Sequence, residues 1–156
     1  MTDGWSDARL ETTYSEARAV LEAQNDTISD VDDKAMRTVR VTVIVVGLVA
    51  SAVRFAGNTF DVLWLAISGV AYVGALVTGV LTYAESTLYL EPGRGYVERL
   101  RRNEFGGRDW RQDLLATYGE WIEQNDRAIR PNGQLLFLTR VLLVAGVAST
   151  AAAIAF

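Results

Sequence analysis

The chain has 156 residues, of which 15 are Lys or Arg and 19 are Asp or Glu, so its formal net charge is −4. It has no Cys and no His, which excludes disulfides, zinc sites built from Cys and His, Cys nucleophiles and Ser-His-Asp triads. The charged residues are concentrated in residues 1–40 and 85–130, although a single soluble domain of this length would spread them more evenly.

The basic residues are almost all arginine, since Lys34 is the single lysine of the chain. Low Lys content with an excess of acid resembles the composition of proteins from salt-loving archaea. In the concentrated salt of such cells the Debye length falls to about 3 Å, so a diffuse basic patch would bind nucleic acid poorly. We therefore expect no nucleic-acid partner.

Residues 1–38 are predicted to form a cytoplasmic helix that carries a coiled-coil seam. Apolar or amide side chains recur at alternating spacings of four and three, at Leu10, Tyr14, Ala17, Leu21, Gln24, Ile28, Val31 and Ala35, a pattern typical of helix pairing. No Pro or Gly interrupts this stretch after Gly4, so the helix is expected to continue into the next segment. The acidic start lacks the apolar core of a signal peptide.

Three apolar segments, residues 39–56, 62–83 and 135–156, are predicted to be transmembrane helices, the first two forming a hairpin over residues 39–83. The middle segment has no charged residue, and roughly 20 apolar residues span the hydrocarbon core of a bilayer. Arg40 and Arg54 lie near the two ends of the first segment, where their side chains can snorkel to the interface. The alternative is that these helices are buried in a soluble bundle. The expected fold class is an all-α integral membrane protein with additional cytoplasmic helices.

Residues 84–134 are predicted to be a cytoplasmic helical loop. The Pro-Gly pair at residues 92–93 is expected to end the second span near residue 90, a short helix is expected over residues 96–103, and Pro131-Asn-Gly133 is expected to break the chain before the third span. A second seam with the same spacing lies at Leu114, Tyr118, Trp121, Asn125 and Ala128. Each seam contains one amide, and an amide at a core position can fix register when it meets a partner. This predicts a Gln24–Asn125 layer; the alternative is that both amides are solvated.

The distribution of basic residues predicts the orientation in the membrane. Arg54, in the last turn of the first span, is the single basic residue near the connection between the first two spans, whereas the N-terminal region and the long loop are rich in arginine. The positive-inside rule places both regions in the cytoplasm and the C-terminus outside the cell (inner) membrane. Within the loop, Arg94, Arg99, Arg101 and Arg102 are expected to contact anionic lipid head groups; the alternative is a phosphate-bearing ligand.

Small residues recur at every fourth position of the spans and are predicted to mediate helix packing. They lie at Gly47 and Ser51, at Ala71, Ala75 and Gly79, and at Ala145, Ser149 and Ala153. Such faces let helix backbones approach closely in lipid, although plain alanine richness is an alternative. The spans contain no Asp, Glu or Lys, which argues against a pump or proton-coupled transporter.

The sequence offers few residues for an enzyme active site. Asp30, Asp32 and Asp33 form a tight acidic set, and neighbouring carboxylates can share a proton or hold a hard cation. No partner residues for them are evident, so we interpret this set as an acidic turn of helix. We expect no catalytic residue, no metal and no cofactor.

The stretch Val31-Asp-Asp-Lys-Ala-Met36 leads directly into the first span, and this arrangement resembles the SLATT-type and Pycsar transmembrane effectors of anti-phage defence. Asp32, Lys34 and Ala35 match the family-like element, and the helix from Tyr118 to Asn125 resembles a later helix of the family. The arginine-rich loop departs from that pattern. The resemblance implies a homo-oligomeric protein of the lipid bilayer that responds to a cyclic nucleotide signal or an upstream sensor protein and permeabilises the membrane.

The expected function is therefore a self-associating, pore-forming or membrane-permeabilising effector. A structural or accessory subunit of a larger membrane complex is the alternative.

Overall fold

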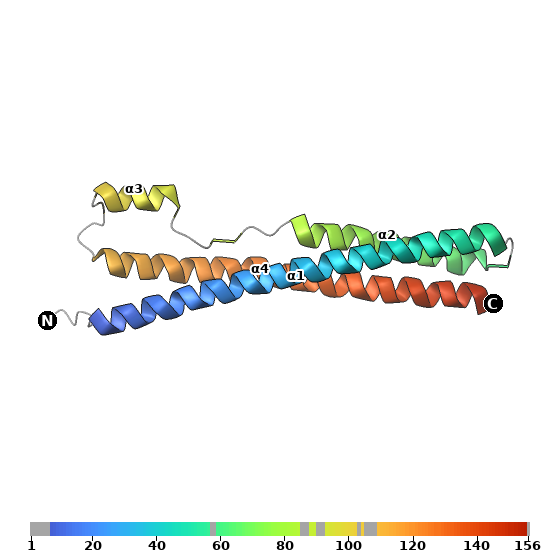
Figure 1. The fold of residues 1–156 in the computed structure, drawn as a ribbon, viewed down its shortest axis with the longest axis horizontal. Helices are drawn as coiled ribbons and strands as arrows, with labels where there is room; N and C mark the ends of the chain where they lie inside the picture. Colours follow the sequence, from blue (N-terminus) through green and yellow to red (C-terminus); the bar gives the residue numbers. More distant parts are fainter. Residues whose placement is uncertain are drawn as a thin grey trace. The chain divides into compact units, whose positions relative to one another are not determined.

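Four α-helices make up the regular structure of the chain. The computed structural model describes residues 7–56, 59–84, 88–89, 93–102, 104 and 109–155. Its helices are α1 (Asp7–Ala56), α2 (Val62–Ala84), α3 (Arg94–Arg102) and α4 (Trp110–Ala155), shown in chain order in Figure 1. The prediction of an all-α fold is confirmed for these residues.

The chain divides into two compact units. Unit 1 comprises Met1–Thr27 and Thr87–Ile129, and unit 2 comprises Ile28–Ser86 and Arg130–Phe156. Helices α1 and α4 each contribute residues to both units. As expected from the uninterrupted sequence, the N-terminal seam and the first apolar segment form one helix of 50 residues.

The break predicted at Pro131-Asn-Gly133 is absent, because α4 continues through Pro131 to Ala155. A proline inside a helix removes one backbone hydrogen bond and costs about 3 kcal/mol. Buried side chains continue along one face of α4 beyond the proline, since Asn132 and Leu136 are 1% and 6% exposed. We attribute the continuity of the helix to this packing.

The predicted boundaries of two other elements also shift. Helix α2 ends at Ala84 instead of near residue 90, and Leu88 and Tyr89 lie outside any helix. Helix α3 begins at Arg94, two residues before the predicted start, with the amides of Tyr96 and Val97 donating to the carbonyl of Gly93 at 2.9 and 3.2 Å. Asn103, the predicted last residue of this helix, lies outside the described residues.

Unit 1 has an apolar core that is built from three of the helices. Leu21 of α1, Tyr96 of α3 and Leu114 and Tyr118 of α4 form one buried apolar cluster. The seam positions predicted for both helices are all buried or half-buried. Contacts pair Asp7 with Arg111 and Gln24 with Asn125, so α1 and α4 run parallel within this unit, with the charged residues mostly exposed.

Unit 2 has the opposite distribution of side chains. Its interior consists largely of small and hydroxyl-bearing residues, including Thr42, Ser68, Ala75, Thr82, Thr139 and Ala153, each at most 1% exposed. Its surface carries large apolar side chains such as Ile44, which is 62% exposed, and Val70, which is 75% exposed. Water-soluble folds bury their large apolar residues, so the distribution of side chains in unit 2 is the reverse of theirs.

The α1–α2 connection is tied to the end of α4. Asp61 accepts hydrogen bonds from the backbone amides of Leu63 and Trp64 at 3.0 and 3.1 Å, which is the geometry of an N-cap. The backbone amide of Asp61 donates to the carbonyl of Ala153 at 2.9 Å. One residue thus caps the start of α2 and satisfies a carbonyl in the last turn of α4.

Candidate functional site: the amide layer and the long apolar helices

The buried polar centre of unit 1 is the layer formed by Gln24 of α1 and Asn125 of α4. The Asn125 Nδ2 donates to Gln24 Oε1 at 3.1 Å. The Gln24 Nε2 donates to the carbonyl of Ile122 at 3.0 Å and to Asp126 Oδ1 at 2.8 Å. Asn125 is 1% exposed. Because buried polar groups are costly when they lack partners, a fully bonded amide pair favours the one register of the two helices in which the amides meet. The structure therefore contains the predicted contact, and the two amides are not solvated.

Asn125 also holds the segment that follows α2. Its Oδ1 accepts from the backbone amide of Tyr89 at 2.9 Å, and its Nδ2 donates to the Tyr89 carbonyl at 3.0 Å. The side chain of Asn125 thus binds both backbone polar groups of one residue while it bonds to Gln24. The sequence offers no signal for Tyr89, because its backbone is what is recognised.

Aromatic side chains pack beside the amide layer. The ring of Tyr118 lies 5.6 Å from that of Tyr14 and 5.4 Å from that of Trp121, measured between ring centroids. Burial, and then a hydrogen bond with Tyr14, raise the pKa of Tyr118 to about 12. Burial and the nearby carboxyl of Asp113 raise the pKa of Tyr96 in the same core. Both phenols are therefore held neutral, as suits structural residues.

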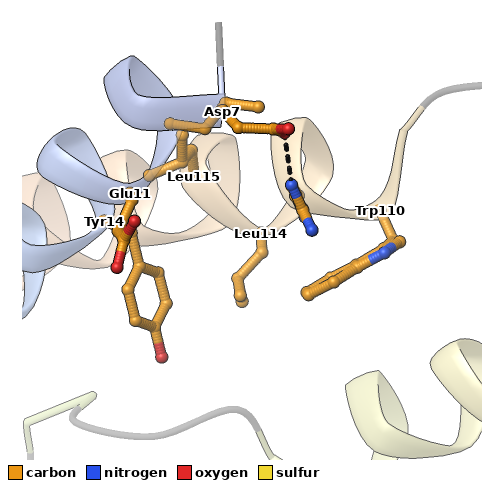
Figure 2. A pocket seen from close by; sticks show the side chains of 8 residues that line it. Asp7, Glu11, Tyr14, Trp110, Leu114 and Leu115 are labelled. Carbon is orange, nitrogen blue, oxygen red and sulfur yellow. Dashed lines mark hydrogen bonds and ion pairs between the residues drawn. The ribbon is translucent and has the colours of Figure 1, made fainter.

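An open groove of about 580 Å³ lies between the first turns of α1 and α4. Figure 2 shows the side chains of Tyr14, Leu114 and Trp110 along it and the ion pair at its edge. In that pair Arg111 donates to Asp7 at 2.7 Å. Both side chains are substantially exposed, so the pair joins the two helix starts without forming a buried charged site.

The predicted small-residue faces of unit 2 fall into two groups. Ala71, Ala75 and Gly79 of α2 and Ser149 and Ala153 of α4 are buried inside the unit. Gly47, Ser51 and Ala145 are exposed, and a Cβ added at Gly47 would meet nothing within 4 Å. The first group forms contacts within the chain, whereas the second faces outward.

Two glycines set the closest approach of the helices in unit 2. A Cβ at Gly146 would lie 2.5 Å from the ring of Tyr72, and one at Gly79 would lie 2.5 Å from Val39 and 3.3 Å from Thr139. Gly146, which the sequence interpretation missed in favour of Ala145, is buried because the inward face follows positions 146, 149 and 153 rather than a strict spacing of four. The sequence signal that indicates the inward position of Gly146 is the 3.6-residue period of the helix, from which a strict spacing of four drifts away.

Hydroxyl pairs connect the same helices. The Tyr72 and Thr150 hydroxyls lie 3.0 Å apart, and the Thr139 hydroxyl donates to that of Thr78 at 2.9 Å. Thr78, Thr139 and Thr150 also lie within hydrogen-bond distance of carbonyls four residues earlier in their own helices. The threonine hydroxyls at these positions are thus paired, whereas the side-chain Nδ2 and Oδ1 of Asn132, also buried in unit 2, have no hydrogen-bond partner within the part of the chain that the structure describes.

The acidic set before the first span forms no site. Asp30 pairs with Lys34 one turn later on an exposed face of α1, Asp33 is exposed, and Asp32 is half-buried. Among the residues that the structure describes, no three potential metal ligands come together. Of the family-like element, Ala35 is fully buried and Lys34 is exposed.

The predicted arginine cluster lies on α3. Arg94, Arg99, Arg101 and Arg102 are all exposed, and Arg99 stacks over the ring of Tyr96 at 5.3 Å. Tyr96 is buried in the core of unit 1, so this residue fixes the position of the basic helix.

Three helices, α1, α2 and α4, are long and apolar enough to cross a membrane by length and composition. This agrees with the three predicted spans. No protein-family model, curated protein or solved structure matches the chain.

Proposed function

We propose that unit 2 is a three-helix membrane bundle and that the chain is an integral protein of the cell membrane. The observation that carries this proposal is the inverted packing of unit 2, with threonine, serine, alanine and glycine inside and valine, leucine and isoleucine outside. In lipid there is no hydrophobic drive to bury large apolar side chains, so small residues that allow close packing occupy the helix interfaces. A soluble bundle would place these side chains the other way round.

The proposed orientation puts the N-terminus and unit 1 in the cytoplasm and the C-terminus outside, in agreement with the positive-inside rule. Because the native chain lacks Cys, single cysteines can report the sidedness of exposed positions. We expect Thr59→Cys to react with a membrane-impermeant maleimide in intact cells, and Glu120→Cys to react only after lysis. The reverse labelling pattern would contradict the orientation.

We further propose that the protein acts as a self-associating effector that permeabilises the membrane. The outward-facing small residues Gly47, Ser51 and Ala145 support this proposal, because a second copy could approach these surfaces closely. The resemblance of Asp32, Lys34 and Ala35 to the SLATT-type and Pycsar effectors also supports it. The amide layer offers a means of control, since Asn125 couples the helix pair of unit 1 to the segment after α2.

Membrane potential provides the test. We expect induction of the protein to depolarise cells, as followed with a potential-sensitive dye, and Gly47→Leu with Ser51→Leu to abolish the effect. Ile44→Leu with Leu48→Ile is the matched control, because both positions are exposed on the same helix and the exchange retains their volume. Wild-type protein that associates but never depolarises cells would instead favour the accessory subunit, since the open surface at Gly47 would equally admit a helix of another protein.

A further inference from the structure

Helix α3 concentrates positive charge on an acidic chain. Four of its nine residues are arginine, namely Arg94, Arg99, Arg101 and Arg102, while the whole chain carries a net charge of −4. The helix contains one acidic residue, Glu98, so its own net charge is 4 − 1 = +3. All four guanidinium groups belong to exposed residues.

The arginine side chains are held in place by contacts within the same short segment. Glu98 Oε1 accepts from Arg101 at 2.7 Å and from the Nε of Arg102 at 3.1 Å, and Arg102 lies 3.8 Å from Glu104. Arg99 rests on the Tyr96 ring. One carboxylate therefore positions two guanidinium groups, and ordering them beforehand reduces the entropy that a ligand must overcome.

The helix itself is anchored. Tyr96 is 7% exposed and packs with Leu21, Leu114 and Tyr118 in the core of unit 1. Tyr96 thus directs the opposite face of α3 to the surface, where Arg94, Arg101 and Arg102 lie on the same side of the helix, spread over slightly more than two turns by helix periodicity.

We propose that the exposed face of α3 binds phosphate groups. The planar guanidinium group presents paired N–H donors that match phosphate oxygens, and the net charge of +3 on the nine residues of α3 favours an anion with more than one charge. Phosphate groups could come from a free pyrophosphate-like ligand or from lipid head groups. This site does not depend on the proposed membrane permeabilisation.

The test uses the full-length protein in nanodiscs of phosphatidylcholine, which carry no net charge. Binding of inorganic pyrophosphate is measured by calorimetry, and binding of vesicles that contain phosphatidylglycerol is measured by flotation. The variant is Arg94→Gln, Arg101→Gln and Arg102→Gln, which removes the three arginines of the face opposite Tyr96. The control is Arg9→Gln, Arg18→Gln and Arg127→Gln, which removes the same charge from exposed positions of unit 1; Arg18 and Arg127 are also ion paired. Helix content by circular dichroism verifies that both variants fold.

We expect wild type to bind at least one probe, the α3 variant to bind it about tenfold or more weakly, and the control to retain most of the affinity. Binding of pyrophosphate alone identifies a free ligand, and binding of vesicles alone identifies head groups; either supports the proposal. Binding should weaken with added salt because the site is exposed. The proposal is overturned if wild type binds neither probe, or if the control loses as much affinity as a folded α3 variant.

Discussion

At the scale of single residues, the Asn125 side chain joins two separate segments of unit 1. It bonds to Gln24 and to both backbone polar groups of Tyr89. An apolar replacement leaves these buried groups without their partners, and each such loss costs about 1–3 kcal/mol. One residue therefore supports both the register of two helices and the path of a connecting segment.

We predict that Asn125→Leu lowers the free energy of unfolding by about 1–3 kcal/mol or more, as measured by denaturant titration in detergent. Gln112→Leu, an exposed position of the same helix, should change it little. In a double-mutant cycle with Gln24→Leu the two effects should be non-additive, because each substitution removes the same hydrogen bond. Additive effects would show that the layer contributes no coupling.

Tyr118 makes stability depend on pH in the alkaline range. Its pKa in the folded protein is about 12, above the usual value of 10, mainly because burial disfavours the phenolate. The unfolded chain therefore loses this proton first, so the stabilising effect is complete below pH 10 and disappears as the pH rises toward about 12.

We predict that Tyr118→Phe, which cannot ionise, weakens the loss of helix content between pH 10 and 12, the interval between the usual and the folded pKa of Tyr118. The helix content is followed against pH by circular dichroism of the full chain in detergent. Tyr89→Phe serves as the control, since Tyr89 is 53% exposed. An alkaline transition identical in wild type and Tyr118→Phe would contradict the assignment.

At the scale of the helices, contacts between α2 and α4 depend on the absence of a side chain at Gly146. A Cβ there would lie 2.5 Å from the Tyr72 ring, whereas one at Gly47 would meet nothing within 4 Å. These two glycines occupy helices in the same unit but differ in what surrounds them, so they form a natural matched pair.

We predict that Gly146→Ala destabilises unit 2 by about 1–3 kcal/mol through overpacking, while Gly47→Ala is neutral or stabilising because alanine favours the helix. The change in the free energy of unfolding of each variant is measured by unfolding in mixed detergent micelles. Tyr72→Ala should relieve the steric part of the Gly146→Ala effect. Equal tolerance of alanine at both glycines would mean that α2 and α4 are not in close contact.

At the scale of the whole molecule, the two units have opposite distributions of apolar and polar side chains. Unit 1 exposes charge around an apolar core, and unit 2 exposes apolar side chains around a core of small residues. Val73 of α2, 60% exposed, is on the surface that we propose faces lipid.

We predict that Val73→Arg reduces the fraction of protein that remains in the membrane after alkaline carbonate extraction, because an arginine near the centre of a span costs about 2.5–3.5 kcal/mol. Glu120→Arg, an exposed change in unit 1, should leave the fraction unchanged. If Val73→Arg behaved as the control does, the outer surface of unit 2 would face water.

Much of the fold followed from local patterns in the sequence. The alternating spacing of apolar residues identified the buried faces of α1 and α4, because helix periodicity alone sets which residues share a face. The long apolar runs located the three candidate spans, because their length and composition are local properties. The single amide in each seam also predicted that Gln24 and Asn125, which are 101 positions apart, meet in one layer.

Tertiary contacts decided what periodicity left open. Whether Ala145 or Gly146 faces inward depends on the ring of Tyr72, which lies on another helix. Whether Pro131 breaks α4 depends on packing around Asn132 and Leu136, and the role of Tyr89 depends on its backbone meeting Asn125. The sequence by itself therefore determined the helices and their apolar faces, since these arise from neighbours along the chain. The contacts between helices were decided only in the tertiary structure, because they depend on side chains far away in sequence.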